Sequence, residues 1–575
     1  MMIRRSLKAV REQLVNNLLR GIVSVAWRGC ELFVVAVIFA GAAQGESTAV
    51  QDVGDYQKRL AAEGPQERAS RVGIESLEVT GETHLPPLKV SSGEAEKPVV
   101  ELSVEEAVVR ALANSSDIRI VSFDPAIAAE DMTRAWSDFD PTVFGRFDYE
   151  RSDAPVNSVS DIGLRDSRVW ENGIKQKNTI GSEWSVSYAL VRNWDDLFTR
   201  RLSTRYEPML LFQLKQPLLR DGWEMVNMAG VNIAKLNHVT AMTSFRQKAE
   251  EVVTQVTGAY WVLVQAKTDV DIQGHLLEKT GETFAKIKAR QGIDATTLHV
   301  KQIEAAMKSR EAFLLSANKR YTDVQEALIR LLADKQLSVL KEFKLTPTSQ
   351  PVLKVDKPEV SEVLRTAMEA NPIIAQARLG IDVAQINVDV AKQQRMPRLD
   401  LVATARVRAL ERGYGAANES IADGDYTGYS VGVTYEYPLG NRQREAELRR
   451  RRLERSKAIS ILHNISDQVA IEAKERIREI EKTQSEMQVQ TEAVEAAEVY
   501  LQTLEDSELV RQNLTPEYLL VKLQAQEALA EAQRAHIKAV VDLNVAVIQL
   551  AQTEGTVFEM AQVKTSLSAG AEKES

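Results

Sequence analysis

Hydrophobic and polar residues alternate along four short stretches of the chain, two in each half. The stretches are 143–150 and 184–190 in the first half, and 398–408 and 429–437 in the second. The longer ones have about ten residues, the length of a tilted strand that crosses a bilayer with one apolar face. The alternation therefore predicts strand hairpins in a membrane. The predicted lipid-facing residues are Phe147, Tyr149, Trp184, Tyr188, Leu401, Val431 and Tyr435.

The number of strands in the first half stays open at this stage. A third apolar run, at 210–214, precedes Pro217. Because the flanking helices must lie on one side of the membrane, each half needs an even number of crossings. The third run therefore continues another strand, stays outside the bilayer, or pairs with a strand hidden in 167–179. We expect four membrane strands per chain and an exposed loop at 411–425; a soluble sandwich hairpin is the competing interpretation.

Long helices are predicted after the strands of each half, because 218–346 and 439–515 contain no proline. As one helix, 223–290 would span roughly 100 Å, whereas 296–335 and 103–138 would each span about 55–60 Å. Placed end to end, the two shorter helices match the long one. The economical arrangement is a helical barrel or bundle in which each long helix runs antiparallel to two short ones. A coiled-coil scaffold would show the same pattern.

The two halves of the sequence repeat each other at two different offsets. Positions 256 residues apart match near the start of the halves, and positions 221 residues apart match later on. The matched pairs are Pro141 with Pro397, Pro217 with Pro438, and 290–293 with 511–514. The first half therefore carries 35 extra residues, the difference between the offsets, among its predicted strands. The four prolines mark the predicted junctions between strands and helices.

Two equivalent turns are predicted to reverse the chain where the long helices end. Gly292 and Asn513 readily adopt the left-handed conformation that ends a helix. Arg290 and Arg511 complement the negative end of the helix dipole. The residues alone leave open whether the turns only cap helices or also contact a partner. The turn residues are Arg290, Gln291, Gly292, Ile293, Arg511, Gln512, Asn513 and Leu514.

The N-terminus has the layout of a secretory signal. Basic residues precede an apolar run, Leu32 to Ala40, which is too short to span a bilayer and is followed by small residues. An N-terminal anchor helix is the alternative. The expected domains are a signal peptide at 1–43, a flexible arm at 44–99, the first repeat at 100–340, a linker at 341–357, the second repeat at 358–555 and a disordered tail at 556–575.

Charge and composition narrow the chemistry. The formal charge of the 575-residue chain is −9, and it becomes −13 without the six basic and two acidic residues of 1–43. Such an acidic protein is a poor candidate for binding nucleic acid. The six histidines lack metal-ligand spacing and Cys30 is the only cysteine, so we expect no metal, no cofactor and no enzymatic activity. The arginine run at 442–455 is interleaved with glutamates, which favours a solvated helix face over a contact with anionic lipid or a partner.

Several short motifs follow one another in a fixed order. They are Leu-Ser-Val-Glu-Glu-Ala at 102–107, Ala-Asn-Ser-Ser-Asp at 113–117, Gln-Pro-Leu-Leu-Arg-Asp-Gly at 216–222, Ala-Asn-Pro at 370–372, Tyr-Pro-Leu-Gly-Asn at 437–441, and the paired turns. Their order and duplication, over about residues 100–555, resemble the TolC-like outer-membrane efflux proteins. Two positions depart from that family's pattern: Ser115-Ser116 stands in place of Asn-Pro, and Asn513 in place of Gly.

The resemblance implies a mainly α fold with a β-barrel part. Long antiparallel helices would form a periplasmic α-barrel, and three chains would close a twelve-stranded barrel in the outer membrane of a diderm bacterium. The turns would dock on a periplasmic adaptor and an inner-membrane transporter. The implied function is a passive exit duct for small molecules that the pump delivers. The alternatives are the outer channel of a type I protein secretion system and, in another class, a coiled-coil envelope scaffold.

Overall fold

The computed structural model describes residues 90–91, 98–155, 157–158, 161–197, 203–291, 295–334, 336–337, 343–424, 426–510 and 516–560. All of them belong to one compact unit, Val72–Ser575. The predicted signal peptide and most of the predicted arm and tail lie outside the described residues. Six of the eight turn residues also lie outside them, namely Gly292, Ile293, Arg511, Gln512, Asn513 and Leu514.

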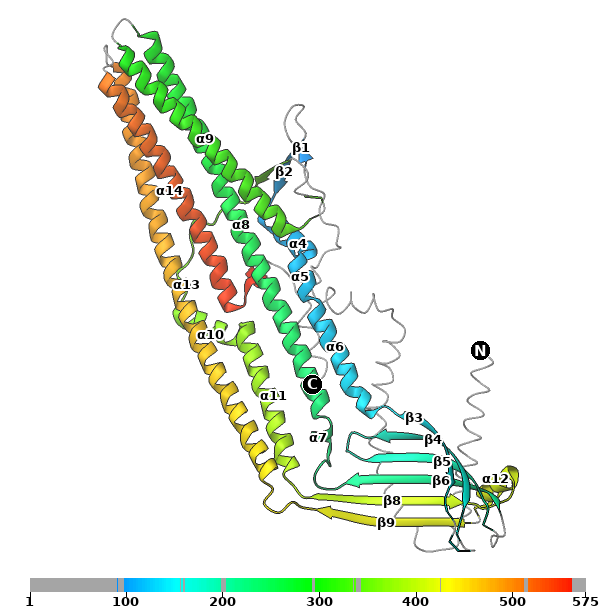
Figure 1. Cartoon of the computed structure of the whole chain (residues 1–575). Coiled ribbons are helices and arrows are strands. Elements are labelled where there is room, and N and C mark those ends of the chain that lie inside the picture. Colours follow the sequence, from blue (N-terminus) through cyan, green and yellow to red (C-terminus); the bar gives the residue numbers. More distant parts are fainter. Residues whose placement is uncertain are drawn as a thin grey trace, which may run out of the picture. The chain divides into compact units, whose positions relative to one another are not determined.

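Two long helices organise the described chain (Figure 1). They are α8 (Ala229–Ala289) with 61 residues and α13 (Arg442–Val510) with 69 residues. Each packs against the helix that follows it and, further along, against the helices that precede the strands of its repeat. The predicted pairing of one long helix with shorter helices in series is thus confirmed. None of the described helices combines the length and the hydropathy needed to cross a membrane.

The remaining helices are shorter. In the first repeat they are α4 (Val104–Asn114), α5 (Ser116–Val121), α6 (Phe123–Trp136), the 3-10 turn η3 (Ser137–Phe139), α7 (Glu224–Asn227) and α9 (Thr297–Leu332). In the second repeat they are α10 (Val360–Ala370), α11 (Pro372–Gln394), α12 (Tyr414–Asp423), α14 (Pro516–Glu554) and α15 (Val557–Met560).

Local capping decides where the shorter helices begin. Ser103 accepts a hydrogen bond from the Glu106 N–H, and the Glu106 carboxylate accepts one from the Ser103 N–H, which makes a capping box before α4. Asn371 caps α11 by accepting from the Ile373 N–H, and Pro372 supplies the first helical residue. In the first repeat Ser115 takes the equivalent extended conformation without a side-chain cap, and α5 still begins at Ser116. The departure from Asn-Pro therefore leaves the helix start in place.

The main hydrophobic core lies where α4, α8 and α9 meet a small sheet. This sheet consists of β1 (Val90–Ser91), β2 (Val99–Leu102) and β7 (Lys344–Pro347), with β2 parallel to β7. Fully buried Tyr260 of α8 donates a hydrogen bond to the Leu102 carbonyl and accepts one from the Ser349 N–H. The start of the first repeat and the segment predicted as a linker are thereby held against the long helix.

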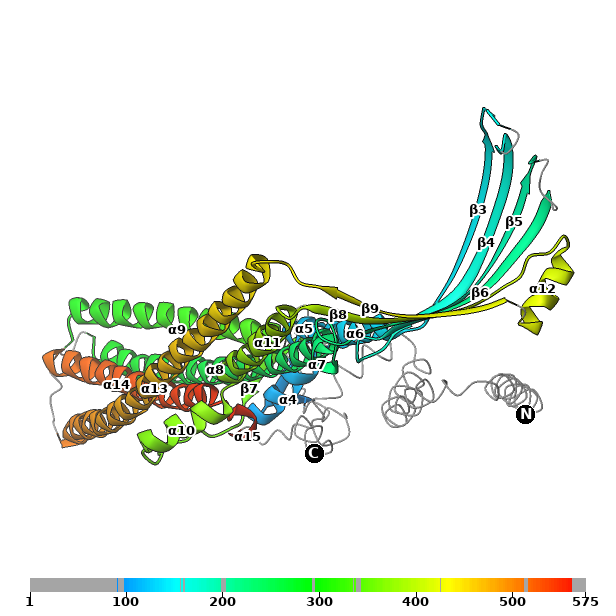
Figure 2. The same cartoon turned by 90° about the horizontal axis from the view of Figure 1, so that it is seen from below.

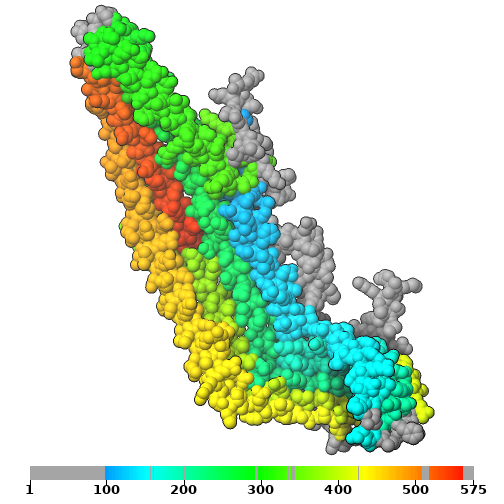
Figure 3. Space-filling model, in the orientation of Figure 1, coloured from blue at the N-terminus to red at the C-terminus, as the bar shows by residue number. Residues whose placement is uncertain are grey.

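A second sheet holds six antiparallel strands in the order β3-β4-β5-β6-β8-β9. The strands are β3 (Thr142–Asp153), β4 (Leu164–Lys177), β5 (Glu183–Asp195), β6 (Thr204–Pro217), β8 (Arg398–Arg408) and β9 (Tyr426–Glu436). Figure 2 shows that these strands curve along their length. In the space-filling view, strands of the first repeat (cyan) and of the second repeat (yellow) form one continuous surface (Figure 3).

The prediction of four strands per chain is wrong, because the first repeat contributes four strands and the second contributes two. The apolar run at 210–214 belongs to β6, which pairs with β5 and β8. The strand that makes the number of crossings even is β4, which covers most of the segment 167–179. The alternation of β4 is hard to read because Arg168 and Asn172 share a face with Trp170 and Ile174. The 35 extra residues of the first half correspond to one additional hairpin.

The segment 411–425 is also not the exposed loop that its glycines and acidic residues suggested. Ten of its residues form α12, which ends at Gly424 in the left-handed conformation. The helix packs on β6, and Ala417 is 0% exposed. The residues that α12 buries, Ala417 and Ser420, are small, so the sequence carries little hydrophobic signal there.

Candidate channel wall and helical tip

One face of the six-stranded sheet carries an apolar row that runs from edge to edge. Residues paired directly across antiparallel strands point to the same face. One continuous cross-strand row consists of Val143, Ile174, Val186, Phe212, Ala405 and Tyr429. The same register places all seven predicted lipid-facing residues on this face, which we call the apolar face. Its exposure is highest on the outermost strands, where Val143 is 76% and Tyr429 is 84% exposed.

The opposite face of the sheet, the polar face, carries charged residues that pair with one another. Arg205 on β6 lies 2.6 Å from Asp195 on β5 and 2.7 Å from Glu207. Arg398 on β8 lies 2.7 Å from buried Asp400. Because each of these charges has an opposite partner, the face is polar without being dominated by one sign of charge.

The two outermost strands each have one unpaired edge. β3 is hydrogen-bonded to β4 alone, and β9 to β8 alone, among the described residues. Both are long, with 12 and 11 residues. An open strand edge presents free backbone N–H and C=O groups, which cannot be left unsatisfied in lipid.

Helix α12 covers part of the apolar face. Tyr188 of β5 donates a hydrogen bond to Asn418 Oδ1 over 2.5 Å. The rings of Tyr206 and Tyr414 meet edge to face with centroids 6.5 Å apart. Two backbone hydrogen bonds between Tyr206 and Glu411 fix the start of the segment. The helix is thus held on β5 and β6 by specific contacts, which the sequence did not reveal.

The four predicted junction prolines all lie at ends of strands. Pro141 precedes β3, Pro217 ends β6, Pro397 precedes β8, and Pro438 follows β9. The junctions of the two repeats also bind each other. The Leu218 N–H donates to the Leu399 carbonyl over 2.7 Å, and Gln393 on α11 donates to the Leu219 carbonyl. These contacts set the orientation of the strands relative to the helices that precede them.

At the far end of the helices, the structure describes Arg290 and Gln291 of the predicted turns. Arg290 follows the last residue of α8, and Gln291 forms a bridge with Ala295 before α9 begins. Just behind the turn, the two helical hairpins pack together through a compact apolar cluster. Its members are Ile287, Val300, Ile303, Tyr518, Leu519 and Leu523. The ends of the two helical hairpins therefore pack together as one unit, which we call the tip.

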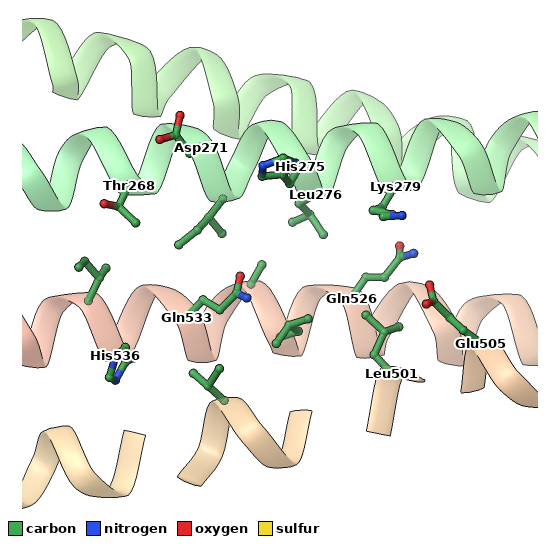
Figure 4. A pocket seen from close by; sticks show the side chains of 15 residues that line it. Thr268, Asp271, His275, Leu276, Lys279, Leu501, Glu505, Gln526, Gln533 and His536 are labelled. Carbon is green, nitrogen blue, oxygen red and sulfur yellow. The ribbon is translucent and has the colours of Figure 1, made fainter. Parts of the chain in front are cut away.

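A groove of about 630 Å³ lies between α8, α13 and α14 on the tip side of the molecule. Its apolar part includes Leu276, Leu501 and Leu529. Figure 4 shows Thr268, Leu276 and Lys279 of α8 on the side that faces α14, with Gln526 and Gln533 of α14 opposite them. A lining that combines apolar and hydrogen-bonding residues fits an amphipathic helix laid along the groove.

A buried arginine joins the two hairpins next to this groove. Arg310 of α9 is 4% exposed and donates to the Leu523 carbonyl of α14 over 2.8 Å and to the hydroxyl of Thr280. Burial lowers the pKa of Arg310, and nearby Glu527 opposes that shift. Sequence reasoning missed Arg310, because it stands among many exposed basic residues on α9.

The described residues contain no group of three or more histidine, cysteine, aspartate or glutamate side chains arranged to hold a metal ion. The arginine run at the start of α13 pairs along its own helix, with Arg451 2.9 Å from both Glu447 and Glu454. This pairing agrees with a solvated helix face. The chemistry of the described chain therefore resides in its surfaces, namely the two faces of the sheet and the tip.

No family model and no curated protein matches the sequence. The fold, in contrast, matches solved outer-membrane channels. The channel OprN shares 15% sequence identity with this chain over 79% of this chain and 90% of its own, with a TM-score of 0.58. VceC from Vibrio cholerae shares 17% identity over 79% and 96%, with a TM-score of 0.54. CmeC from Campylobacter jejuni shares 12% over 79% and 86%, with a TM-score of 0.54.

The chain therefore has the fold of these outer-membrane channels. At the level of the fold, the resemblance to TolC-like outer-membrane efflux proteins is confirmed.

Proposed function

We propose that this chain is one subunit of a homotrimeric outer-membrane exit channel, which passively conducts small molecules from an inner-membrane pump and a periplasmic adaptor to the cell exterior. The observation that carries the proposal is the apolar face, whose row from Val143 to Tyr429 crosses all six strands opposite a polar face. A soluble protein would cover such a surface or keep it small. In a membrane barrel the apolar face contacts lipid and the polar face lines the passage.

The direction of the chain supports the orientation. Each hairpin leaves the helices and returns to them, so the strands cross the membrane while the helices stay on one side. The helices then extend through the periplasm, with the tip pointing away from the membrane. In this orientation the turn residues and the groove beside α14 meet the adaptor. The groove suits a helix of the adaptor, because its lining combines apolar and hydrogen-bonding side chains.

The polar face supports the proposal of passive conduction. A duct must hold its cargo weakly enough to release it, so a wall with strong charge of one sign would retain oppositely charged solutes. Here the charges are paired, as in Arg205 with Asp195 and Arg398 with Asp400. The energy for transport would come from the pump, and the polar wall would only keep the channel lumen filled with water.

A pair of neighbouring substitutions on β9 tests this function. Val431 lies on the apolar face and is paired with Ala403, whereas Ser430 lies on the polar face and is paired with Thr404. An arginine facing lipid costs roughly 2–4 kcal/mol at the bilayer midplane, whereas one facing a wet lumen costs little. Val431→Arg should therefore reduce the heat-labile oligomer in outer-membrane fractions. Ser430→Arg should leave assembly intact and change the ion selectivity of channels in planar bilayers.

The scaffold interpretation makes the opposite prediction. A coiled-coil envelope protein would be a monodisperse species that needs no detergent, and the two substitutions would then have equal effects. Either result would contradict the proposed function.

A further inference from the structure

We propose that all six strands of each chain enter the membrane barrel, with β9 of one copy paired to β3 of the next, so that three copies close an 18-stranded ring. This inference rests on the proposed trimeric channel and deepens it, because it fixes the interface between copies and the width of the membrane passage. It replaces the twelve-stranded barrel that the sequence led us to expect.

The first argument is that one chain cannot close its own barrel. The smallest membrane barrels of single chains have about eight strands. This chain supplies six, and its sheet ends at β3 and β9. In lipid the free backbone groups of both edges must find partners, and the only edges of matching length on the described chain are these two.

The second argument is geometric. β3 leaves the helical part and β9 returns to it, so β9 of one copy and β3 of the next are antiparallel, as are all other neighbours in the sheet. The even number of strands keeps this alternation unbroken around a ring. The strand lengths, 11 and 12 residues, also match.

The third argument is that the β9 edge lacks every usual protection against pairing. Exposed edges are normally blunted with lysine, proline, inward charges or bulges. Ten of the eleven residues of β9 are uncharged, proline is missing from it, and its single charge, Glu436, stands at the end nearest the helices. On β3 the half nearest the helices, 142–147, has only Arg146 as a charged residue, whereas the far half, 148–153, has four. The unprotected part of the β3 edge is therefore the half nearest the helices. The edge of β9 and the near half of β3 are suited to pairing with each other.

The apolar face remains continuous across this joint. Val143 on β3 and Tyr429, Val431, Val433 and Tyr435 on β9 belong to the same face. Antiparallel pairing of the two edges in a register of the correct parity places this face of β3, which is uncharged from Val143 to Tyr149, next to the same face of β9. The curvature of the strands (Figure 2) is in keeping with closure into a ring.

The width of the passage follows from the strand number. Barrel diameter grows roughly linearly with the number of strands, so 18 strands give a ring about 1.5 times as wide as 12 strands would. Barrels of about 16–18 strands leave an aqueous channel. The membrane part would then admit bulkier solutes than a twelve-stranded ring, and the tip would set the size limit.

Cysteine pairs in the full-length chain, with Cys30 replaced by serine, test the interface. Val143→Cys is combined in turn with Val431→Cys, Val433→Cys and Tyr435→Cys, so that three registers of the same face are sampled. The control combines Phe144→Cys, which points to the opposite face, with the same three partners. After oxidation in outer membranes we expect covalent links between subunits from at least one Val143 pair and none from the Phe144 pairs.

The competing ring uses only four strands per chain, namely β5, β6, β8 and β9, and would expose β5 as the edge. Its signature is a link between Val186→Cys and Val433→Cys on adjacent copies, since both residues lie on the apolar face. That link, or the lack of any β3–β9 link in membrane-inserted oligomers, would overturn the proposal. A chain that forms no oligomer in the outer membrane would instead contradict the proposed function itself.

The ring width provides a second measurement that needs no cysteine. Electron microscopy of the detergent-solubilised oligomer, viewed along its axis, should show a membrane ring about 1.5-fold wider than a twelve-stranded barrel. The matched variant lacks 154–203 and joins β3 to β6 through an Asn-Gly turn, which leaves four strands per chain. If it assembles, its ring should be the narrower one. A wild-type ring of twelve-stranded width contradicts the proposal whether or not this variant folds.

Discussion

The two repeats of this chain agree in their helices and differ in their strands. The long helices have 61 and 69 residues, and the helices that follow them have 36 and 39. The first repeat nevertheless supplies four strands to the common sheet, twice as many as the second. The extra residues of the first repeat therefore lie among its strands and not in its long helices.

The physical reason is that an insertion disturbs a packed long helix more than it disturbs a sheet of hairpins. Each long helix packs along its whole length against other helices, so an insertion would shift every later contact out of register. A β-hairpin returns the chain to the side from which it came, and each strand bonds only to its neighbours. An added hairpin therefore widens the sheet and leaves the helices undisturbed. The second repeat carries a different addition, α12, in the loop between its two strands.

Labelling of single cysteines, in a Cys30→Ser background, should show an all-or-none difference between the two ends of the molecule. Ala422 lies on the exposed side of α12, and Thr297 lies at the tip of the first repeat. In intact cells a membrane-impermeant maleimide should label Ala422→Cys and leave Thr297→Cys unmodified until the outer membrane is permeabilised. Ala417→Cys serves as the control for α12, because burial on the sheet should protect it. Labelling of Thr297→Cys alone would mean that the topology is inverted.

Among substitutions in the helical part, the largest effect should come from a buried ion pair of the first repeat. Arg110 of α4 and Asp334 lie 2.5 Å apart, with side chains 1% and 3% exposed. Arg110→Ala leaves the aspartate charge buried without this partner, which costs roughly 3–5 kcal/mol. The change should lower the denaturant midpoint of unfolding. Arg365→Ala on α10 of the second repeat is the control, because its ion pair with Glu369 is exposed. Equal effects of the two substitutions would contradict this assignment.

A smaller effect should distinguish the equivalent helix starts. Asn371 caps α11 and donates a 2.9 Å hydrogen bond to the Thr553 carbonyl. It therefore links the start of α11 to the end of α14 within the second repeat. Asn371→Ala should cost about 1–2 kcal/mol, since a cap and a buried hydrogen bond are lost. Ser115→Ala should cost little, because the Ser115 side chain makes no capping bond. Unfolding curves of the two variants, compared with that of the parent protein, measure the difference.

The helical part of this fold could be predicted from the sequence in considerable detail. Runs of more than seventy residues without proline and a capping box at Ser103 fix helix type and helix start locally. The strands were predicted less completely. In β4 the charged Arg168 and the polar Asn172 interrupt the apolar face. The alternation of apolar and polar residues was therefore too weak to predict this strand. The parity requirement left three possibilities open, and one of them, a further strand in 167–179, corresponds to β4.

Long-range contacts could not be predicted from one sequence. Arg110 and Asp334 are separated by 224 positions, and nothing in either segment specifies the other. The docking of α12 on Tyr188 and Tyr206 likewise depends on a partner surface that exists only after β5 and β6 have paired. For the tip, the sequence identified equivalent turns, and most of their residues lie outside the described part of the chain. Their role in adaptor contact therefore stays a prediction.

The turns of the two repeats should respond differently to substitution. Gly292→Val places a β-branched residue where we predict a left-handed backbone, at a local cost of about 1–2 kcal/mol. This is little for a whole trimer, so assembly should survive while transport and cross-linking to the adaptor decrease. Asn513→Gly should be nearly silent, because both residues accept the left-handed conformation. Full transport and unchanged cross-linking in Gly292→Val would mean that the turn is only a helix cap.

The smallest expected effect is a pH dependence contributed by a histidine of the first repeat that the second repeat lacks at the equivalent position. Burial on α8 lowers the pKa of His238 from its usual 6.5, so the folded state binds a proton less readily than the unfolded state. Stability that His238 contributes is therefore complete above about pH 6.5 and decreases as the pH falls below it. The equivalent position on α13, 221 residues later, is Ile459, which does not titrate. His238→Gln should make the unfolding midpoint less sensitive to acid between pH 7 and pH 5 than that of the parent protein, and identical pH profiles would show that the histidine is not effectively buried.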